Sequence, residues 1–317
     1  MTEQNATAPA QTGPPGNWGR WGEDDERGAV NLLTPDVVLA AAGAVREGRV
    51  LSLSLPIRGA TSGHAPQTVP HLPGRPLPQH FMSVDGADYC AGARRLNGEI
   101  GVADDALIIS HHGTTTHIDA LSHMWRGDEL YNGHPAQRVR SYGATRCGIE
   151  KAGPIVARGV LFDVAGHLGV PHLDESVRID ADLLQEVAKA KGIEVRPGDV
   201  AVVRTGWPTV YGTDRARYQG GQPGLTHDGG LWLAEQDVVA VACDNAGIGA
   251  LAMDGSFDAG PDEDLHLLLL WAFGVYLVEM LWLEELAATD RHDFLFVAAP
   301  LAIEGGTGSA VNPVAVL

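Results

Sequence analysis

The chain of 317 residues has few cysteines and no cluster of basic side chains. Its three cysteines, Cys90, Cys147 and Cys243, are far apart, and none belongs to a Cys-x-x-Cys pair. This spacing excludes the dense disulfide framework of small secreted proteins, so we expect a reducing, cytoplasmic setting. Lysine and arginine number 22 against 40 aspartates and glutamates, which gives a formal net charge of −18. Because binding to a phosphate backbone depends on lysine and arginine, we do not expect nucleic acid as a partner.

The sequence also lacks an uninterrupted hydrophobic run that would cross a membrane. Its longest apolar stretch, residues 265–283, is interrupted by His266, Gly274 and Glu279, which favours a buried helix followed by a strand. Residues 1–16 are small and polar and lack the basic start and apolar run of a secretory signal, so we expect a disordered tail there. With 44% hydrophobic residues, the remainder, 17–317, is long enough to bury the core of one large domain.

Helix and strand patterns alternate along the chain. Thr34 followed by Pro35 predicts an N-cap and a helix that continues to Glu47, while leucines and serines alternate over 51–55 as in a half-buried strand. Apolar runs and turn signals predict further strands at 106–110, 159–164, 200–204 and 238–242, and a helix over 180–191. Five prolines between residues 66 and 78 predict a loop that covers a site. The alternation indicates a single α/β domain.

Four of the thirteen histidines lie within thirteen consecutive residues that begin at His111. His117 and Asp119 are two residues apart, so on an extended backbone both side chains project to one face and can share a divalent cation. His112 lies just upstream of this pair and His123 just downstream. An isolated His-x-Asp pair is usually structural, whereas this density of imidazoles beside a carboxylate indicates a metal or catalytic site of the zinc or manganese kind.

Two further candidate ligands occur in the last quarter of the chain. The acidic residues 262–264 fit the first turn of a helix, and His266 lies within that helix start. Residues 275–280 have the pattern of a strand that carries Glu279 in an apolar setting. A buried carboxylate is costly unless it is paired or binds a cation, so Glu279 requires a partner. A bound metal fits this pattern as well as the alternative, in which Glu279 forms a salt bridge with an arginine or lies at a partly exposed strand end.

These residues resemble the cyclase family of metal-dependent hydrolases, which includes bacterial kynurenine formamidase and isatin hydrolase. The family motif His-x-Gly-Thr-His-x-Asp-x-Pro-x-His matches in register at His117, Asp119 and His123, with Leu121 in place of the proline. The resemblance to the longer branch of the family extends over most of the chain, through the segments 21–25, 31–35, 198–200, 204–207 and 305–309.

The resemblance implies that His117, Asp119, His266 and Glu279 hold the metal and that His123 is the general acid and base. In the family another ligand histidine lies four residues before the middle histidine, where this chain has Gly113. Either His112 or His111 reaches the metal through a two-residue insertion, or this ligand is lost. If His112 reaches in, the complete metal site is preserved.

The resemblance further implies the reaction, the fold and the assembly. It predicts a hydrolase that opens an amide, lactam or related acyl bond of a small cyclic or aromatic metabolite, with zinc or manganese as the cofactor. Cyclisation or dehydration on the same fold, and small-molecule binding without catalysis, are the alternatives. The family fold is a swivelling β/β/α arrangement with a β-barrel-like core, and its members form homodimers or homotetramers. Trp207 and Phe81 are candidates for contact with the substrate.

Overall fold

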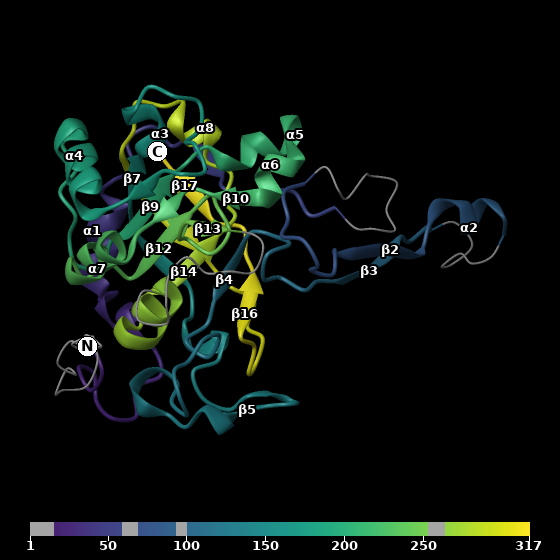
Figure 1. Cartoon of the computed structure of the whole chain (residues 1–317). Helices are drawn as coiled ribbons and strands as arrows, with labels where there is room; N and C mark the ends of the chain where they lie inside the picture. Colours follow the sequence, from purple (N-terminus) through teal and green to yellow (C-terminus); the bar gives the residue numbers. More distant parts are fainter. Residues whose placement is uncertain (1–15, 59–68, 93–99, 253–263) are drawn as a thin grey trace, which may run out of the picture.

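A nine-stranded curled sheet forms the centre of the protein, as the computed structural model shows for residues 16–58, 69–92, 100–252 and 264–317 (Figure 1). In spatial order its strands are β1 (Val50–Ser52), β17 (Val314–Val316), β15 (Asp293–Ala298), β7 (Ile155–Asp163), β9 (Val200–Arg204), β12 (Ala240–Cys243), β14 (Tyr276–Glu279), β4 (His117–Asp119) and β16 (Gly308–Ala310). Strands β7, β9, β12 and β14 run parallel, and β15 and β4 join them antiparallel on either side.

The parallel strands are buried almost throughout, which explains their continuous apolar sequences. Every residue of β9, β12 and β14 is buried. Parallel strands carry hydrophobic residues on both faces because both faces are covered. The predicted strands at 200–204 and 275–280 are therefore confirmed within one residue or two, and the strand predicted at 159–164 is the second half of β7. The α/β class is confirmed.

Three helices, α1 (Pro35–Ala42), α4 (Ala181–Lys191) and α7 (His227–Glu235), cover one side of the sheet (Figure 1). Asp180 caps α4 by accepting from the Leu183 amide, as the sequence predicts, and Gly192 follows the helix with a φ of 66°. The predicted helix was expected to reach residue 47, but α1 stops at Ala42. There the chain turns, and the amides of Glu47 and Gly48 donate to the Leu317 carbonyl beside β17.

Shorter elements connect this framework. The remaining helical segments are η1 (Gly28–Leu32), α2 (Gly86–Cys90), η3 (Tyr131–Gly133), η4 (Ala136–Arg138), η5 (Ile149–Lys151), α3 (Val164–His167), η6 (Trp207–Thr209), α5 (Val210–Thr213), α6 (Arg215–Gly220), the π-helix η7 (Leu267–Phe273) and α8 (Glu284–Ala287). Within the described residues, four two-stranded sheets pair β2 (Gln79–Val84) with β3 (Asp104–Ile108), β5 (Val139–Arg140) with β6 (Gly143–Ala144), β11 (Gly224–Leu225) with β8 (Arg178–Ile179), and β10 (Gly221–Gln222) with β13 (Leu251–Ala252).

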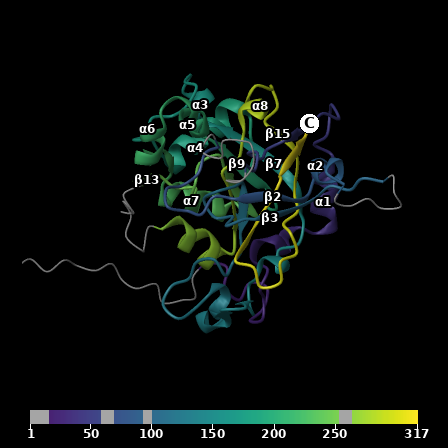
Figure 2. The ribbon, with the colours of Figure 1, turned by 90° about the vertical axis from the view of Figure 1, so that its right-hand side faces the viewer.

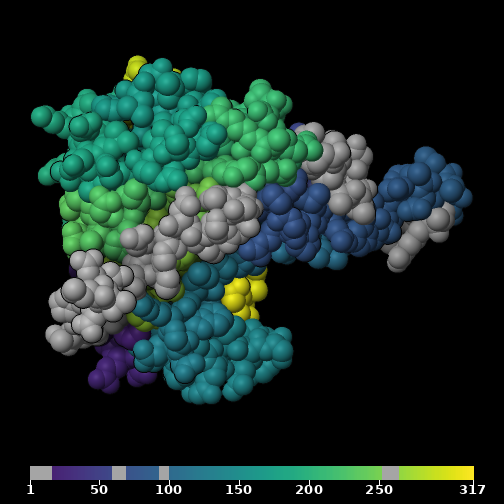
Figure 3. All heavy atoms as spheres, in the orientation of Figure 1, coloured from purple at the N-terminus to yellow at the C-terminus, as the bar shows by residue number. Residues whose placement is uncertain are grey.

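The β2–β3 hairpin extends from the body of the protein as an arm (Figures 1 and 3). Figure 2 looks along this arm toward the central sheet. Apolar side chains on both strands are exposed, among them Phe81 and Leu107. The strand predicted at 106–110 is β3, which begins two residues earlier and ends at Ile108. The chain leaves the arm directly into the histidine-rich segment, so the base of the arm lies at the candidate site.

The segment that begins at Gly16 lies across the π-helix η7. Asn17 donates to the Phe273 carbonyl, and the Trp18 indole donates to the Trp271 carbonyl. The rings of Trp18 and Trp271 meet edge to face, with centroids 5.0 Å apart. This segment therefore covers the chain's own core. The expected disordered tail lies outside the described residues except for Gly16. In the part of the chain that the structure describes, no helix is both long and apolar enough to cross a membrane.

Candidate metal centre

Three acidic or imidazole side chains meet on one face of two paired strands. His117 on β4 lies opposite Glu279 on β14 in the antiparallel register, and Asp119 follows two residues after His117. Since side chains two residues apart share a face of a strand, all three point to the same side. His117 Nε2 lies 3.4 Å from Glu279 Oε2 and 3.6 Å from Asp119 Oδ1. All three residues are buried, and imidazole and carboxylate are ligand types that zinc accepts.

Loop residues on both sides of β4 add two further imidazoles. His112 Nε2 lies 3.2 Å from Asp119 Oδ1, and the rings of His112 and His123 stack with centroids 3.9 Å apart. Two groups of side chains each place one ligand atom per residue within 4.8 Å of the others: His112, Asp119 and His123 form one group, and His117, Asp119 and Glu279 form the other. Asp119 belongs to both, so the arrangement can accept one cation or two.

His266 completes the cluster from the start of the π-helix. Its Nε2 atom lies 3.3 Å from Glu279 Oε1 and 3.8 Å from Asp119 Oδ2. Asp264 accepts a hydrogen bond from the Leu267 amide, so it caps the first turn as an acidic residue there is expected to do. The other two residues of the predicted acidic turn, 262 and 263, lie outside the described residues. The π-helical winding was not predicted, and such segments occur frequently at functional sites.

Several polar atoms of this cluster lack a hydrogen-bond partner among the described residues. These buried atoms include both carboxylate oxygens of Asp119, Oε1 of Glu279 and Nε2 of His112. A buried polar atom without a partner costs about 1–3 kcal/mol, and more if it is charged. A divalent cation accepts electron pairs from these same atoms and removes this cost, because carboxylate oxygen and imidazole nitrogen are ligands of zinc and manganese. The residues present therefore fit a metal.

The local charges favour the ionised form of both carboxylates. Burial and the nearby Asp119 oppose the charged form of Glu279, but His266 and His117 lower the pKa of its carboxyl overall. Burial disfavours the charged form of Asp119, but the neighbouring His123 and His112 hold the pKa of its carboxyl well below the usual range. Burial also opposes the charged form of His266, yet the adjacent Glu279 and Asp119 raise the pKa of this imidazole to about 9. Burial dominates at His123 and lowers its pKa to about 4. At pH 7 without a cation, His266 therefore carries a proton and His123 does not.

Hydrogen bonds outside the cluster orient two of the candidate ligands. The Nδ1 atom of His117 lies 2.8 Å from the Thr115 carbonyl, which can only accept, so Nδ1 carries the proton and Nε2 is free for a metal. The Gly247 amide donates to Glu279 Oε2 at 2.8 Å. Gly247 was not among the predicted site residues. The sequence signal for its loop was the pair Asp244-Asn245, directly after the buried strand β12.

Two glycines shape the space around the histidines. Gly308 lies opposite Asp119 in the β16–β4 ladder, and a Cβ there would lie 2.8 Å from His112 Nε2 and 2.8 Å from the Ile118 carbonyl oxygen. Gly113, where the family motif has a ligand, has a φ of 73° and faces Leu72. The structure thus places His112 at Asp119. The His111 ring lies next to it, with centroids 4.3 Å apart, and His111 Nε2 would lie 3.0 Å from the same Cβ at Gly308.

The described part of the proline-rich segment, 69–78, lies beside the histidine loop. The Leu72 amide donates to the Gly113 carbonyl at 2.8 Å. Leu72 also packs against a small apolar cluster that contains Met280, the residue after Glu279. The prediction that this segment covers a site is consistent with these contacts for the described residues. Residues 66–68 lie outside them.

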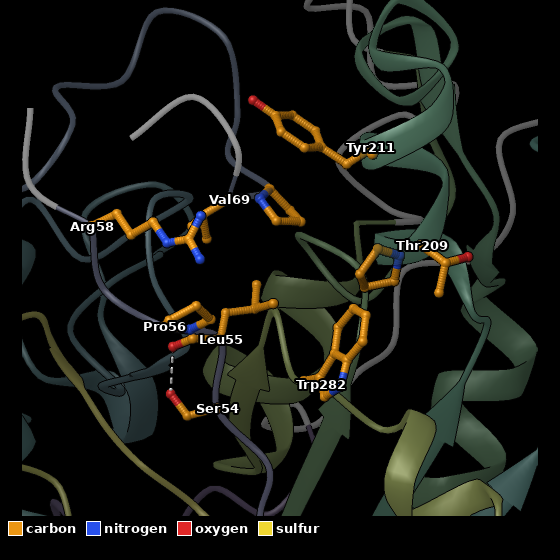
Figure 4. Close-up of a pocket in the computed structure, with 11 residues that line it drawn as sticks. Ser54, Leu55, Pro56, Arg58, Val69, Thr209, Tyr211 and Trp282 are labelled. Atoms are coloured by element: carbon orange, nitrogen blue, oxygen red, sulfur yellow. Dashed lines mark hydrogen bonds between the residues drawn. The ribbon is translucent and has the colours of Figure 1, made fainter. Parts of the chain in front are cut away.

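A pocket of about 280 Å³ borders this apolar cluster (Figure 4). Leu55 and Val69 belong to this cluster, Trp282 packs against it, and all three also line the pocket. Pro208, Tyr211 and Arg58 are among the other lining residues. Trp207, predicted to contact substrate, is fully buried behind Pro208 and stacks on Tyr218. Phe81 lies on the arm and is 44% exposed. Neither aromatic residue belongs to the metal-ligand cluster.

Comparisons with known proteins agree on one family and one fold. A model of the putative cyclase family matches residues 51–250. The crystal structure of a novel cyclase is 36% identical, with a TM-score of 0.85 over 96% of this chain and 100% of that one. An isatin hydrolase bound to the product analogue thioisatinate is 20% identical, with a TM-score of 0.60 over 90% and 99% of the two chains. Isatin hydrolase A from Ralstonia solanacearum is 22% identical, with a TM-score of 0.59 over 89% and 98%. No curated protein sequence matches the chain significantly.

Proposed function

Because the chain belongs to the cyclase family, we propose that it is a metal-dependent hydrolase that opens an amide, lactam or related acyl bond of a small cyclic or aromatic metabolite. The observation that carries this proposal is the buried cluster of imidazoles and carboxylates around Asp119, whose oxygens have no hydrogen-bond partner among the described residues. The likeness in fold to two isatin hydrolases supports the class of reaction.

In the proposed site, His112, His117, Asp119, His266 and Glu279 hold zinc or manganese. The bound cation supplies Lewis acidity, which activates water and polarises the carbonyl under attack. The choice between the two metals depends on availability as much as on ligand type, because imidazole and carboxylate accept both. Asp119 is central, since it is shared by both groups of ligand atoms.

His123 is the proposed general acid and base. Its ring is neutral at pH 7 because burial lowers its pKa, and it stacks on His112 at the edge of the cluster. A neutral imidazole there accepts a proton from the attacking water and returns it to the leaving nitrogen. His123 also lies among the ligand atoms of one group, so a second cation would compete with this role. Two metal equivalents per chain would favour ligation, and one would favour proton transfer.

The substrate is proposed to bind in the pocket of Figure 4, whose lining residues Leu55 and Val69 pack in the same apolar cluster as Met280, the residue after Glu279. Aromatic and proline side chains in the wall suit a flat ring, as in most small-molecule pockets. Contact through Trp207 is indirect in this arrangement, because Pro208 and not Trp207 lines the pocket. Contact between Phe81 and the substrate would require the arm to reach a substrate site, and this contact stays a prediction.

A homo-oligomer is proposed as the working form. The arm exposes Phe81, Leu107 and Ile108, and an isolated two-stranded hairpin is only marginally stable in water. Light scattering after size-exclusion chromatography tests this proposal: a mass of two or four chains supports it, and the 33.4 kDa mass of one chain contradicts it.

The experiment that tests the proposed reaction combines metal analysis with a substrate panel. The protein is purified without a histidine tag or chelator, loaded with zinc or manganese, and incubated with amides and lactams in ¹⁸O-labelled water. Hydrolysis predicts a ring-opened or cleaved product that carries the label. Cyclisation or dehydration predicts a product without it. Ligand binding with no turnover and no bound metal would favour the non-catalytic alternative.

A further inference from the structure

A tight loop, residues 244–249, follows β12 and lies against the candidate metal ligands. Its Gly247 amide donates to Glu279 Oε2, and a Cβ at Gly247 would lie 3.8 Å from Cε1 of His266. Both Gly247 and Ile248 have positive φ angles, of 81° and 60°. A backbone of this shape is unfavourable for an ordinary residue such as isoleucine and persists only where its surroundings impose it.

Two buried amide side chains impose this shape. Gln222 brackets Ala246: its Nε2 donates to the Ala246 carbonyl, and its Oε1 accepts from the Ala246 amide at 3.2 Å. The same Nε2 donates to the Gly249 carbonyl at 2.9 Å. The Gln222 side chain thereby gives the backbone of Ala246, directly before Gly247, the pair of hydrogen bonds that a neighbouring strand would otherwise supply. Its side chain is fully buried, and it lies on β10, outside the loop that it holds.

Asn245 holds the same loop from within. Its Nδ2 donates to the Pro223 carbonyl at 2.7 Å and to the Ile248 carbonyl at 3.1 Å. Its backbone carbonyl accepts from the Met280 amide at 3.0 Å, which ties the loop to the residue after Glu279. The Gly247 amide is thus fixed on both sides, by Gln222 at Ala246 and by Asn245 at Ile248.

The fixed amide determines how Glu279 can be presented to a cation. With Oε2 held by Gly247, the other oxygen, Oε1, points toward His266 at 3.3 Å and has no hydrogen bond among the described residues. A carboxylate that is held in this way loses little rotational freedom when it binds a metal. If the loop relaxed, the carboxylate could rotate, and the metal would have to order it again.

We propose that Gln222 and Asn245 are positioning residues that fix the loop 244–249, so that its Gly247 amide orients Glu279 for metal binding. This inference rests on the proposed function, because it takes Glu279 as a metal ligand. Neither residue touches the ligand atoms of the cluster. Loss of such an outer partner typically costs 10–100-fold in metal affinity.

The test measures zinc affinity in Gln222→Glu and Gln222→Met by competition with a chelating dye. The first variant keeps the shape but sets a carboxylate oxygen against the Ala246 and Gly249 carbonyls, and the second keeps the length without polar atoms. We expect the apparent Kd for zinc to rise about 10–100-fold in both. Asn245→Ser, whose hydroxyl is too short to reach both carbonyls, is expected to behave in the same way.

Asp199→Asn is the matched control. Asp199 is also buried and also orders a turn, through the Arg158 guanidinium and the Arg196 amide, but it lies at the amino end of β9. The loop 244–249 follows the carboxyl end of the neighbouring parallel strand. This control is expected to lose thermal stability and to keep the wild-type zinc Kd, which separates general destabilisation from positioning.

Failure of the positioning inference and failure of the proposed function give different results. If the wild-type chain binds neither zinc nor manganese, the proposed function is wrong. If it binds metal and the Gln222 and Asn245 variants bind within twofold of wild type, the positioning inference is overturned. A measurement without any variant adds a further check: in the metal-free wild type, amide hydrogen exchange at 244–249 is expected to be slow, and fast exchange would contradict the inference.

Discussion

Replacement of Gly308 by alanine is expected to damage the metal cluster without removing any ligand. The new methyl group would lie 2.8 Å from the Ile118 carbonyl oxygen and 2.8 Å from His112 Nε2, where ordinary contacts exceed 3.4 Å. The carbonyl belongs to β4, so it cannot move without shifting Asp119. The His112 ring is held by its stack on His123. Overpacking of this kind costs about 1–3 kcal/mol, which for a chain of this length corresponds to a decrease of about 2–5 °C in Tm.

The assay compares Gly308→Ala with Gly220→Ala by differential scanning calorimetry and zinc titration. At Gly220 the added methyl group meets no heavy atom within 4 Å, and the residue does not need a positive φ. The Gly308 variant is expected to show the lower Tm and at least a tenfold weaker zinc affinity, since His112 and Asp119 are displaced together. Equal zinc affinity in the two variants would refute the placement of His112 beside Gly308.

Three further predictions concern the ligands and the proton-transfer residue. Asp119→Ala is expected to abolish bound metal and turnover together, because both groups of ligand atoms include Asp119; elemental mass spectrometry and the substrate assay check this, and full activity would sink the assignment. His123→Gln is expected to retain at least one metal equivalent and to lose about 10²–10⁴-fold in kcat, the usual contribution of a general acid and base; unchanged kcat would remove His123 from that role. Zinc affinity of the wild type is expected to increase as the pH rises toward 9, because the pKa of His266 is raised to about 9 and metal binding must displace its proton; calorimetric titration in buffers of different ionisation enthalpy counts the released proton, and none released at pH 7 would contradict the charge state of His266.

Short-range sequence patterns predicted much of the fold. The buried strand β9 and the capped helix α4 follow the sequence pattern closely, because continuous apolar runs and an Asp N-cap act locally. The common face of His117 and Asp119 follows in the same way from the period of a strand. The meeting of Glu279 with His117 is different, since the register of β14 on β4 depends on residues 162 positions apart, and only the family resemblance suggested it.

Long-range contacts explain what the sequence left open. Helix α1 ends at Ala42, and the chain then turns so that the Glu47 and Gly48 amides donate to the Leu317 carbonyl, a contact that no local pattern predicts. The π-helix η7 is covered by the segment around Trp18, and no local rule predicts that winding. The contributions of Gly247 and Gly308 depend on atoms from other strands within 4 Å, so their roles could be read only from the structure.

The metal content of the untagged protein shows whether the cluster around Asp119 binds a cation. Elemental mass spectrometry on protein purified without chelator is expected to find one or two equivalents of zinc or manganese per chain, and Asp119→Ala purified in parallel is expected to contain none. A wild-type chain that is metal-free and takes up neither metal when it is added would contradict the account. In that case the buried oxygens of Asp119 and Glu279 would need another partner.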